Sequence, residues 1–251
     1  MKRINEICLP VFLVGMVFFV SGQAQAVPVN LLRNPSFENV PCATPCNQDQ
    51  AFMPSEWLTS QVTPDTYSND GSYGILPGDF GNFTGVTAQD GIRWVAGWSS
   101  AGHERFGQTL TAPLTAGEDY DFSGYLHQAI RDDLNFPGGY ELYLTSSSAG
   151  ASLDTGVFLG LLGPTTSFES GWDLFSLSFT APGNAGSLPF LMFNPVVTGA
   201  GAAYPGLDNV SLSLTAPPGP GPLPEPPTVL LLGLGWIGLV ATSSLRRIRL
   251  Q

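Results

Sequence analysis

The chain has 251 residues and a formal net charge of −11, with nine Lys and Arg against twenty Asp and Glu. Charged residues make up only 12% of it, whereas glycine and proline number 30 and 22. Low charge with many turn-forming residues is typical of an all-β secreted domain. Between residues 27 and 215 the only basic residues are four arginines. Binding to phosphate backbones requires clustered Lys and Arg, so nucleic acid is excluded as a partner.

The N-terminus has the three parts of a secretory signal peptide. Lys2 and Arg3 precede an apolar run over 7–20, and the small-residue sequence Ala24-Gln25-Ala26 follows it. This order predicts a signal peptide over 1–26, with cleavage after Ala26. A membrane anchor is the alternative, but the apolar run is short for one.

A second apolar segment lies near the C-terminus. Residues 228–245 are uncharged and rich in Leu, Gly and Val. Eighteen residues are just long enough to cross a bilayer of roughly 30 Å as a helix. The basic tail over 246–251, with Arg246, Arg247 and Arg249, would stay cytoplasmic, which places the body of the protein outside. The segment therefore predicts a transmembrane helix, and a plain tail anchor is the simplest interpretation.

The tripeptide Pro224-Glu225-Pro226 precedes this segment, within a Pro/Gly linker over 216–227. Tripeptide, short apolar helix and basic end, in this order, resemble the PEP-CTERM sorting signal of Gram-negative bacteria. The resemblance covers about the last 28 residues. It implies that an exosortase-type membrane enzyme cuts near the tripeptide and releases or transfers the body. We therefore expect export through the inner membrane to the cell surface or extracellular matrix, in a biofilm or exopolysaccharide setting.

Two cysteines remain once the signal peptide is removed. Cys42 and Cys46 are separated by three residues in a turn-rich segment. In an oxidising compartment this pair predicts a local disulfide that fixes one loop. A zinc site is the weaker alternative, because no other Cys or His lies nearby in sequence.

The body, residues 27–215, contains short β-type runs separated by Gly, Pro, Asn and Asp. The clearest runs are 120–126, 139–144, 174–180, 189–193 and 208–214. In 174–180, Phe175, Leu177 and Phe179 alternate with mainly polar residues, which indicates a half-buried strand. No helix of useful length is evident. This pattern predicts a single all-β sandwich of jelly-roll or related topology.

Three short motifs in the body carry a second resemblance. Asn30-Leu-Leu-Arg-Asn-Pro-Ser-Phe-Glu38 opens it, Gly107-Gln-Thr-Leu110 lies mid-chain, and Gly206-Leu-Asp-Asn-Val-Ser-Leu212 closes it. This order resembles the galactose-binding-like jelly rolls, which include several carbohydrate-binding modules. The resemblance implies that the opening and closing strands lie side by side. It also implies that Glu38 and Asp208 help to hold a structural Ca²⁺, an ion that prefers oxygen ligands. Capping of loop backbone is the alternative role for both carboxylates.

Aromatic residues supply candidate sugar contacts, because the C–H face of a sugar stacks on an exposed ring. Trp94 and Trp98 flank three residues, and an extended chain would place both on one face. They line a groove or fill the core, and the loop-like run after Trp98 favours its exposure. Polar side chains that could recognise sugar hydroxyls are Asp90, Arg93, His127, Gln128 and Arg131.

Catalytic motifs are missing from the sequence. It has no G-x-S-x-G elbow, no H-E-x-x-H and no phosphate-binding loop. The two charge-dense runs, 103–105 and 131–133, are interpreted as solvated loops. The sequence thus predicts a non-catalytic module that binds polysaccharide or surface glycan. A structural acidic matrix protein without a ligand is the first alternative, and a glycan-active hydrolase is the second. Two carboxyl groups about 5–10 Å apart in a cleft would favour the hydrolase.

Overall fold

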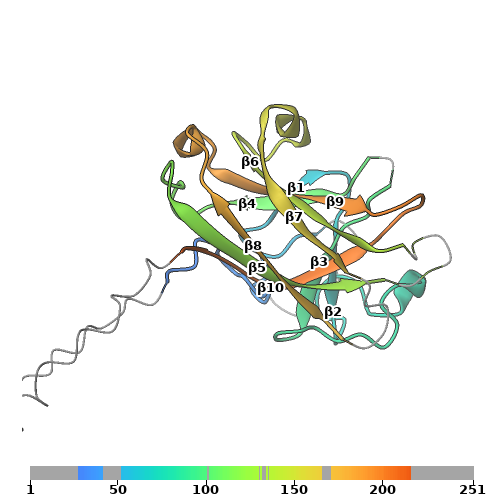
Figure 1. The fold of residues 1–251 in the computed structure, drawn as a ribbon. Coiled ribbons are helices and arrows are strands. Elements are labelled where there is room, and N and C mark those ends of the chain that lie inside the picture. The colour runs from blue at the N-terminus through green and yellow to red at the C-terminus, as the bar shows by residue number, and fades with distance from the viewer. Residues whose placement is uncertain are drawn as a thin grey trace, which may run out of the picture.

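The computed structural model describes residues 28–41, 52–100, 102–129, 131, 134, 136–165 and 171–215. These residues form one β-sandwich (Figure 1). The signal peptide, the linker, the transmembrane segment, the basic tail and the pair Cys42 and Cys46 lie outside them. Among the residues described, no helix has both the length and the apolar character needed to span a membrane.

Ten strands divide equally between two sheets in which all neighbouring strands are antiparallel. The first sheet has the order β1 (Leu58–Gln61), β4 (Arg105–Thr109), β9 (Phe190–Val197), β6 (Gly138–Thr145) and β7 (Val157–Thr165). The second has the order β2 (Asp65–Ser68), β3 (Arg93–Ala96), β10 (Pro205–Leu214), β5 (Asp119–Gln128) and β8 (Asp173–Thr180). The described helices are three short 3₁₀ segments, η1 (Asp79–Gly81), η2 (Gly150–Thr155) and η3 (Ala185–Ser187). The predicted all-β sandwich is confirmed, and its strand order is consistent with a jelly roll.

The five runs that the sequence indicated most clearly are all strands, namely β5, β6, β8, β9 and β10. In β8 the exposure alternates along the whole strand, with Phe175, Leu177 and Phe179 packed against the core. Leu174 belongs to the opposite, solvent face and is exposed. The period of two therefore identified both the strand and its buried face.

The opening and closing segments lie side by side, as the resemblance implied. The N–H of Leu31 donates to the carbonyl of Leu212 at 2.7 Å, and the N–H of Val210 donates to the carbonyl of Pro35 at 3.0 Å. The side chain of Asn30 bonds to the carbonyl of Val210 and to the N–H of Leu212. The opening segment itself is irregular, because bends and turns run from Leu32 to Phe37.

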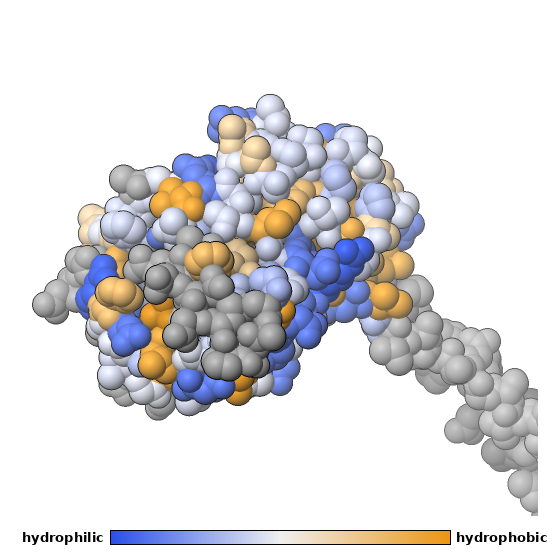
Figure 2. Space-filling model, turned by 180° about the vertical axis from the view of Figure 1, so that it is seen from behind, coloured by the Kyte–Doolittle hydropathy of each residue, from blue (hydrophilic) through white to orange (hydrophobic). Residues whose placement is uncertain are grey.

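Aromatic rings dominate the core between the sheets. Phe193 is fully buried, and its ring lies within about 6 Å, centre to centre, of those of Trp57, Phe106, Phe122 and Tyr140. On the face that Figure 2 shows, exposed apolar residues lie in separate small groups among polar ones. The large apolar cluster of this domain is therefore internal.

Phe193→Ala is expected to lower the free energy of unfolding by about 3–5 kcal/mol, because it leaves a cavity among four aromatic rings. Chemical denaturation of the purified protein measures this change. Phe158→Ala is the matched control, since Phe158 is half exposed and should cost less than about 1 kcal/mol. Equal losses in the two variants would contradict this description of the core.

Candidate functional site

Glu38 and Asp208 hold loop backbone. Both oxygens of Asp208 accept backbone N–H groups, Oδ2 from Gln89 and Asp90 and Oδ1 from Asn209, at 2.7–3.0 Å. Glu38 Oε1 accepts the N–H groups of Ile92 and Arg93 at 2.8 Å. The two carboxylates thus fasten the loop that leads into β3. Gly91 passes so close to Glu38, with φ at +69°, that a Cβ there would collide with the carboxylate.

The same contacts test the expected calcium site. The remaining oxygen, Glu38 Oε2, accepts the guanidinium of Arg93 at 3.1 Å. All four carboxylate oxygens therefore already have N–H partners, whereas Ca²⁺ takes six to eight oxygen ligands. Within the described residues, no three His, Cys, Asp or Glu side chains gather in a metal-binding cluster. Asp208 Oδ1 and Glu38 Oε2 each accept only one N–H group and keep a second lone pair that could ligate an ion. Calcium binding stays a prediction, and calorimetric titration with Ca²⁺ would test it.

Burial raises the pKa of Asp208 to about 8, although three backbone N–H groups favour its ionised form. The nearby charge of Glu38 acts in the same direction as burial. The loop is thus fixed by a carboxyl group that loses its proton only near pH 8.

Three of the expected sugar-contacting residues are buried. Trp94 is completely inaccessible and stacks on Tyr67, with ring centres 5.3 Å apart. His127 packs between the rings of Phe83 and Trp172. The Arg93 side chain pairs with Glu38. None of these side chains presents a surface to a ligand.

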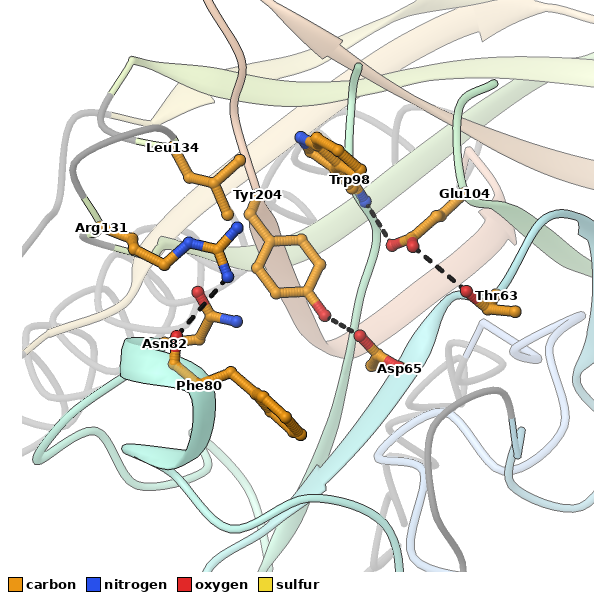
Figure 3. Close-up of a pocket in the computed structure, with 9 residues that line it drawn as sticks. All are labelled: Thr63, Asp65, Phe80, Asn82, Trp98, Glu104, Arg131, Leu134 and Tyr204. Carbon is orange, nitrogen blue, oxygen red and sulfur yellow. Dashed lines mark hydrogen bonds between the residues drawn. The ribbon is translucent and has the colours of Figure 1, made fainter. Parts of the chain in front are cut away.

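Trp98 and Arg131, the other two, line one cleft (Figure 3). Its volume is about 220 Å³. Five segments supply its walls, namely the β1–β2 connection with the first residue of β2, the segment around η1, the β3–β4 connection, the β5–β6 connection and the residue before β10. The lining residues are Thr63, Asp65, Phe80, Asn82, Trp98, Glu104, Arg131, Leu134 and Tyr204.

The turn after β3 positions Trp98 and Glu104. β3 ends at Ala96, and the backbone N–H of Trp98 then donates to Glu104 Oε2 at 2.8 Å. In return, the N–H of Glu104 donates to the carbonyl of Trp98 at 3.0 Å. Next to Trp98, Ser99 exchanges hydrogen bonds with the backbone of Ala203. These hydrogen bonds therefore hold the Trp98 indole and the Glu104 carboxyl group at the two ends of one turn.

Two carboxyl groups share the cleft. The hydroxyl of Tyr204 donates to Asp65 Oδ2, and that of Thr63 donates to Glu104 Oε1 at 3.4 Å. Burial, followed by the negative charge of Asp65, raises the pKa of Glu104 to about 7. The pKa of Tyr204 lies well above its usual value because the ring is buried. Near neutral pH the cleft therefore holds one carboxyl group that binds and releases a proton readily.

The rest of the wall combines apolar and polar surface. The indole of Trp98 is 37% exposed and the ring of Phe80 is 63% exposed. Arg131 donates to the carbonyl of Phe80 at 3.5 Å. Asn82 is almost fully buried. Flat rings beside hydrogen-bonding groups suit an amphipathic ligand such as a sugar.

Sequence reasoning placed Trp98 correctly but misjudged Glu104. Residues 103–105 were interpreted as a solvated loop, and that interpretation is wrong for Glu104, which is 8% exposed. The signal in the sequence that could have identified Glu104 was a carboxylate close to Trp98 in a chain with few charged residues. Asp65, Asn82 and Tyr204 carried no sequence signal of this kind. Asp132 and Asp133, from the other charge-dense run, lie outside the described residues.

The sequence matches no protein-family model and no curated protein. Among solved structures, the chain is similar to the Stig cyclase Fisc from Fischerella sp. TAU, with 15% identity and a TM-score of 0.46 over 76% of this chain and 100% of that one. It is also similar to the CBM22-1 xylan-binding domain of Paenibacillus barcinonensis Xyn10C, with 14% identity and a TM-score of 0.45 over 78% and 100%. A third is TmCBM61 in complex with β-1,4-galactotriose, with 14% identity and a TM-score of 0.39 over 74% and 99%. At this level, similarity assigns neither a ligand nor a reaction.

Glu104→Gln is expected to flatten the pH dependence of stability. Between about pH 4.5 and 7 the folded protein keeps a proton on Glu104 that the unfolded chain has lost, so the free energy of unfolding falls as pH rises. The variant should match the wild type near pH 4.5 and exceed it at pH 8, by on the order of 1–3 kcal/mol.

Thermal unfolding of both proteins from pH 4.5 to 9 measures this difference. Asp208 contributes a slope of the same sign to both, so the comparison isolates Glu104. Parallel curves for the two proteins would show that Glu104 titrates normally.

Proposed function

We propose that this sandwich is a non-catalytic glycan-binding module, and that the cleft beside Trp98 receives one ring of a sugar chain. The observation that carries the proposal is the pairing of exposed rings with buried polar groups in one concavity. A volume of about 220 Å³ is smaller than the roughly 300–1,000 Å³ of pockets for drug-sized ligands. It suits a single ring with the rest of the chain outside.

Binding would combine stacking with hydrogen bonding. The C–H face of the sugar packs on the indole of Trp98, while Phe80 extends the apolar surface at the rim. The side chains of Asp65, Glu104 and Arg131 line the same cleft and carry the polar groups that could contact the hydroxyl groups. Because the turn from Trp98 to Glu104 is held by reciprocal hydrogen bonds, little ordering is required on binding.

Trp98→Ala is expected to weaken glycan binding at least ten-fold, because it removes the main stacking surface, a loss of about 1.4 kcal/mol or more. A glycan array, followed by affinity-gel electrophoresis or calorimetry on the purified protein, identifies the ligand and measures the change. Phe158→Ala, an exposed ring that does not line the cleft, should bind as the wild type does.

The controls separate the alternatives. Equal binding by wild type and Trp98→Ala would place the glycan elsewhere on the protein. No binding to any polysaccharide would favour the other class of function, an acidic structural protein of the matrix or cell surface with no specific ligand.

A second candidate function is glycoside hydrolysis, which the carboxyl pair in the cleft favours. Hydrolysis needs one protonated and one ionised carboxyl group. Burial and the charge of Asp65 raise the pKa of Glu104 to about 7, so Glu104 could supply the protonated group at neutral pH. Product analysis of every bound oligosaccharide tests this function, and cleavage that disappears in Glu104→Gln would favour it over simple binding.

Export and sorting complete the proposal. The signal peptide, the tripeptide Pro224-Glu225-Pro226 and the basic tail support export to the Gram-negative cell surface or matrix through an exosortase-type enzyme. Mass spectrometry of the mature protein would locate its ends. A C-terminus that still includes Arg249 would contradict processing.

A further inference from the structure

Charge is unevenly distributed inside the cleft. Figure 3 shows Asp65 and Glu104 at one end and Arg131 at the other, with Tyr204 between them. The two carboxyl groups oppose each other's ionisation, since the charge of Asp65 raises the pKa of Glu104. A positive group placed between them would remove this repulsion and keep both ionised.

A buried acceptor adds to this asymmetry. Asn82 lines the cleft and is 5% exposed, yet its Oδ1 atom has no hydrogen-bond partner. Its amide group points between Arg131 and Tyr204 (Figure 3). A buried acceptor without a donor is unfavourable, so a ligand that donates to it gains affinity. The cleft therefore offers several oxygen acceptors to a ligand rich in donors.

We propose that the sugar selected by this cleft carries a free, protonated amino group held between Asp65 and Glu104. This inference rests on the proposed glycan binding at the same cleft. An ammonium group has three donors and no acceptor, which matches the carboxylate oxygens of Asp65 and Glu104, while a hydroxyl of the same sugar is left to donate to Asn82 at the Arg131 end. Arg131, at the opposite end, directs the cation toward the carboxyl groups.

N-acetylation of the same sugar removes both the positive charge of the amino group and its match to a wall of acceptors. The acetamide is neutral, and its carbonyl is an acceptor that would face carboxylate oxygens. Its extra atoms must also fit within about 220 Å³. The geometry thus selects an amino sugar over its N-acetylated counterpart.

The charge of the whole body acts in the same direction. Of its four arginines, Arg33 is paired with Glu56 and Arg93 with Glu38. Residues 27–215 carry four arginines against eighteen Asp and Glu, so the body is strongly acidic and its field attracts cationic sugar chains toward the surface. Such attraction is screened by salt, whereas contacts within the cleft are screened much less.

The test compares β-1,4-linked hexamers of glucosamine, N-acetylglucosamine and glucose, titrated calorimetrically into the purified protein at pH 7. The glucosamine hexamer is expected to bind at least ten-fold more tightly than either of the others, in low salt and in 0.5 M salt. Hexalysine, a cation without a sugar ring, is expected to bind weakly and to be lost in 0.5 M salt.

Substitutions in the cleft test whether the preference for the glucosamine hexamer arises there. Asp65→Asn and Glu104→Gln keep the shape of the side chains and should reduce the preference for glucosamine to less than three-fold. Asp119→Asn, on β5 outside the cleft, should leave it unchanged. If Asp65→Asn does not fold, Glu104→Gln carries the test, and its binding to the neutral hexamer shows that the cleft is intact.

The outcomes separate the two proposals. Equal affinity for the three hexamers would overturn the amino-sugar inference and leave glycan binding standing. Hexalysine binding as tight as that of the glucosamine hexamer would overturn the inference in favour of general attraction between charges. No binding of any hexamer or of any glycan on the array would overturn glycan binding and, with it, this inference.

Discussion

Strand β10 is the last strand among the described residues and the central strand of its sheet, and many contacts of the sandwich depend on it. It pairs with β3 on one side and β5 on the other, and its carbonyl and N–H groups also bind the opening segment. Asp208 on this strand fastens the loop that leads into β3. The hydroxyl of Tyr140, on the opposite sheet, donates to the carbonyl of Pro205. Contacts between segments far apart in sequence therefore hold the two sheets and the opening segment together.

The cleft lies where β10 begins, and it shows a different balance of forces from the core. Between the sheets, Phe193 and its aromatic neighbours gain stability by leaving water. In the cleft, Asp65 and Glu104 are nearly as inaccessible, and burial of Glu104 costs free energy that its hydrogen bonds only partly offset. Replacement of Glu104 by a neutral group would make the folded protein more stable above pH 7. Carboxyl groups kept at such a cost are typical of binding and catalytic sites.

The aromatic residues also divide between the core and the cleft. Trp57, Tyr67 and Trp94 fill the interior, whereas Trp98 and Phe80 remain partly exposed beside the carboxyl groups. Rings that stack on a ligand must be held rigidly and must keep one face in solvent. The turn after β3 meets both conditions for Trp98, because its backbone is fixed by Glu104 and its indole lies at the edge of the cleft.

The sequence alone determined the class of fold, the main strands and the juxtaposition of the first and last segments. Periodicity in β8 also identified its buried face, because side chains alternate with a period of two along any strand. The loop-like run after Trp98 favoured its exposure, but nothing in the sequence showed that Trp94 is fully buried. Their spacing implies a shared face only in a continuous strand, and β3 ends between them at Ala96. Nor could the sequence predict that Asp65, Glu104 and Tyr204 line the same cleft. Which carboxyl groups become buried depends on which loops converge at one end of the sandwich, and only the tertiary structure decides that.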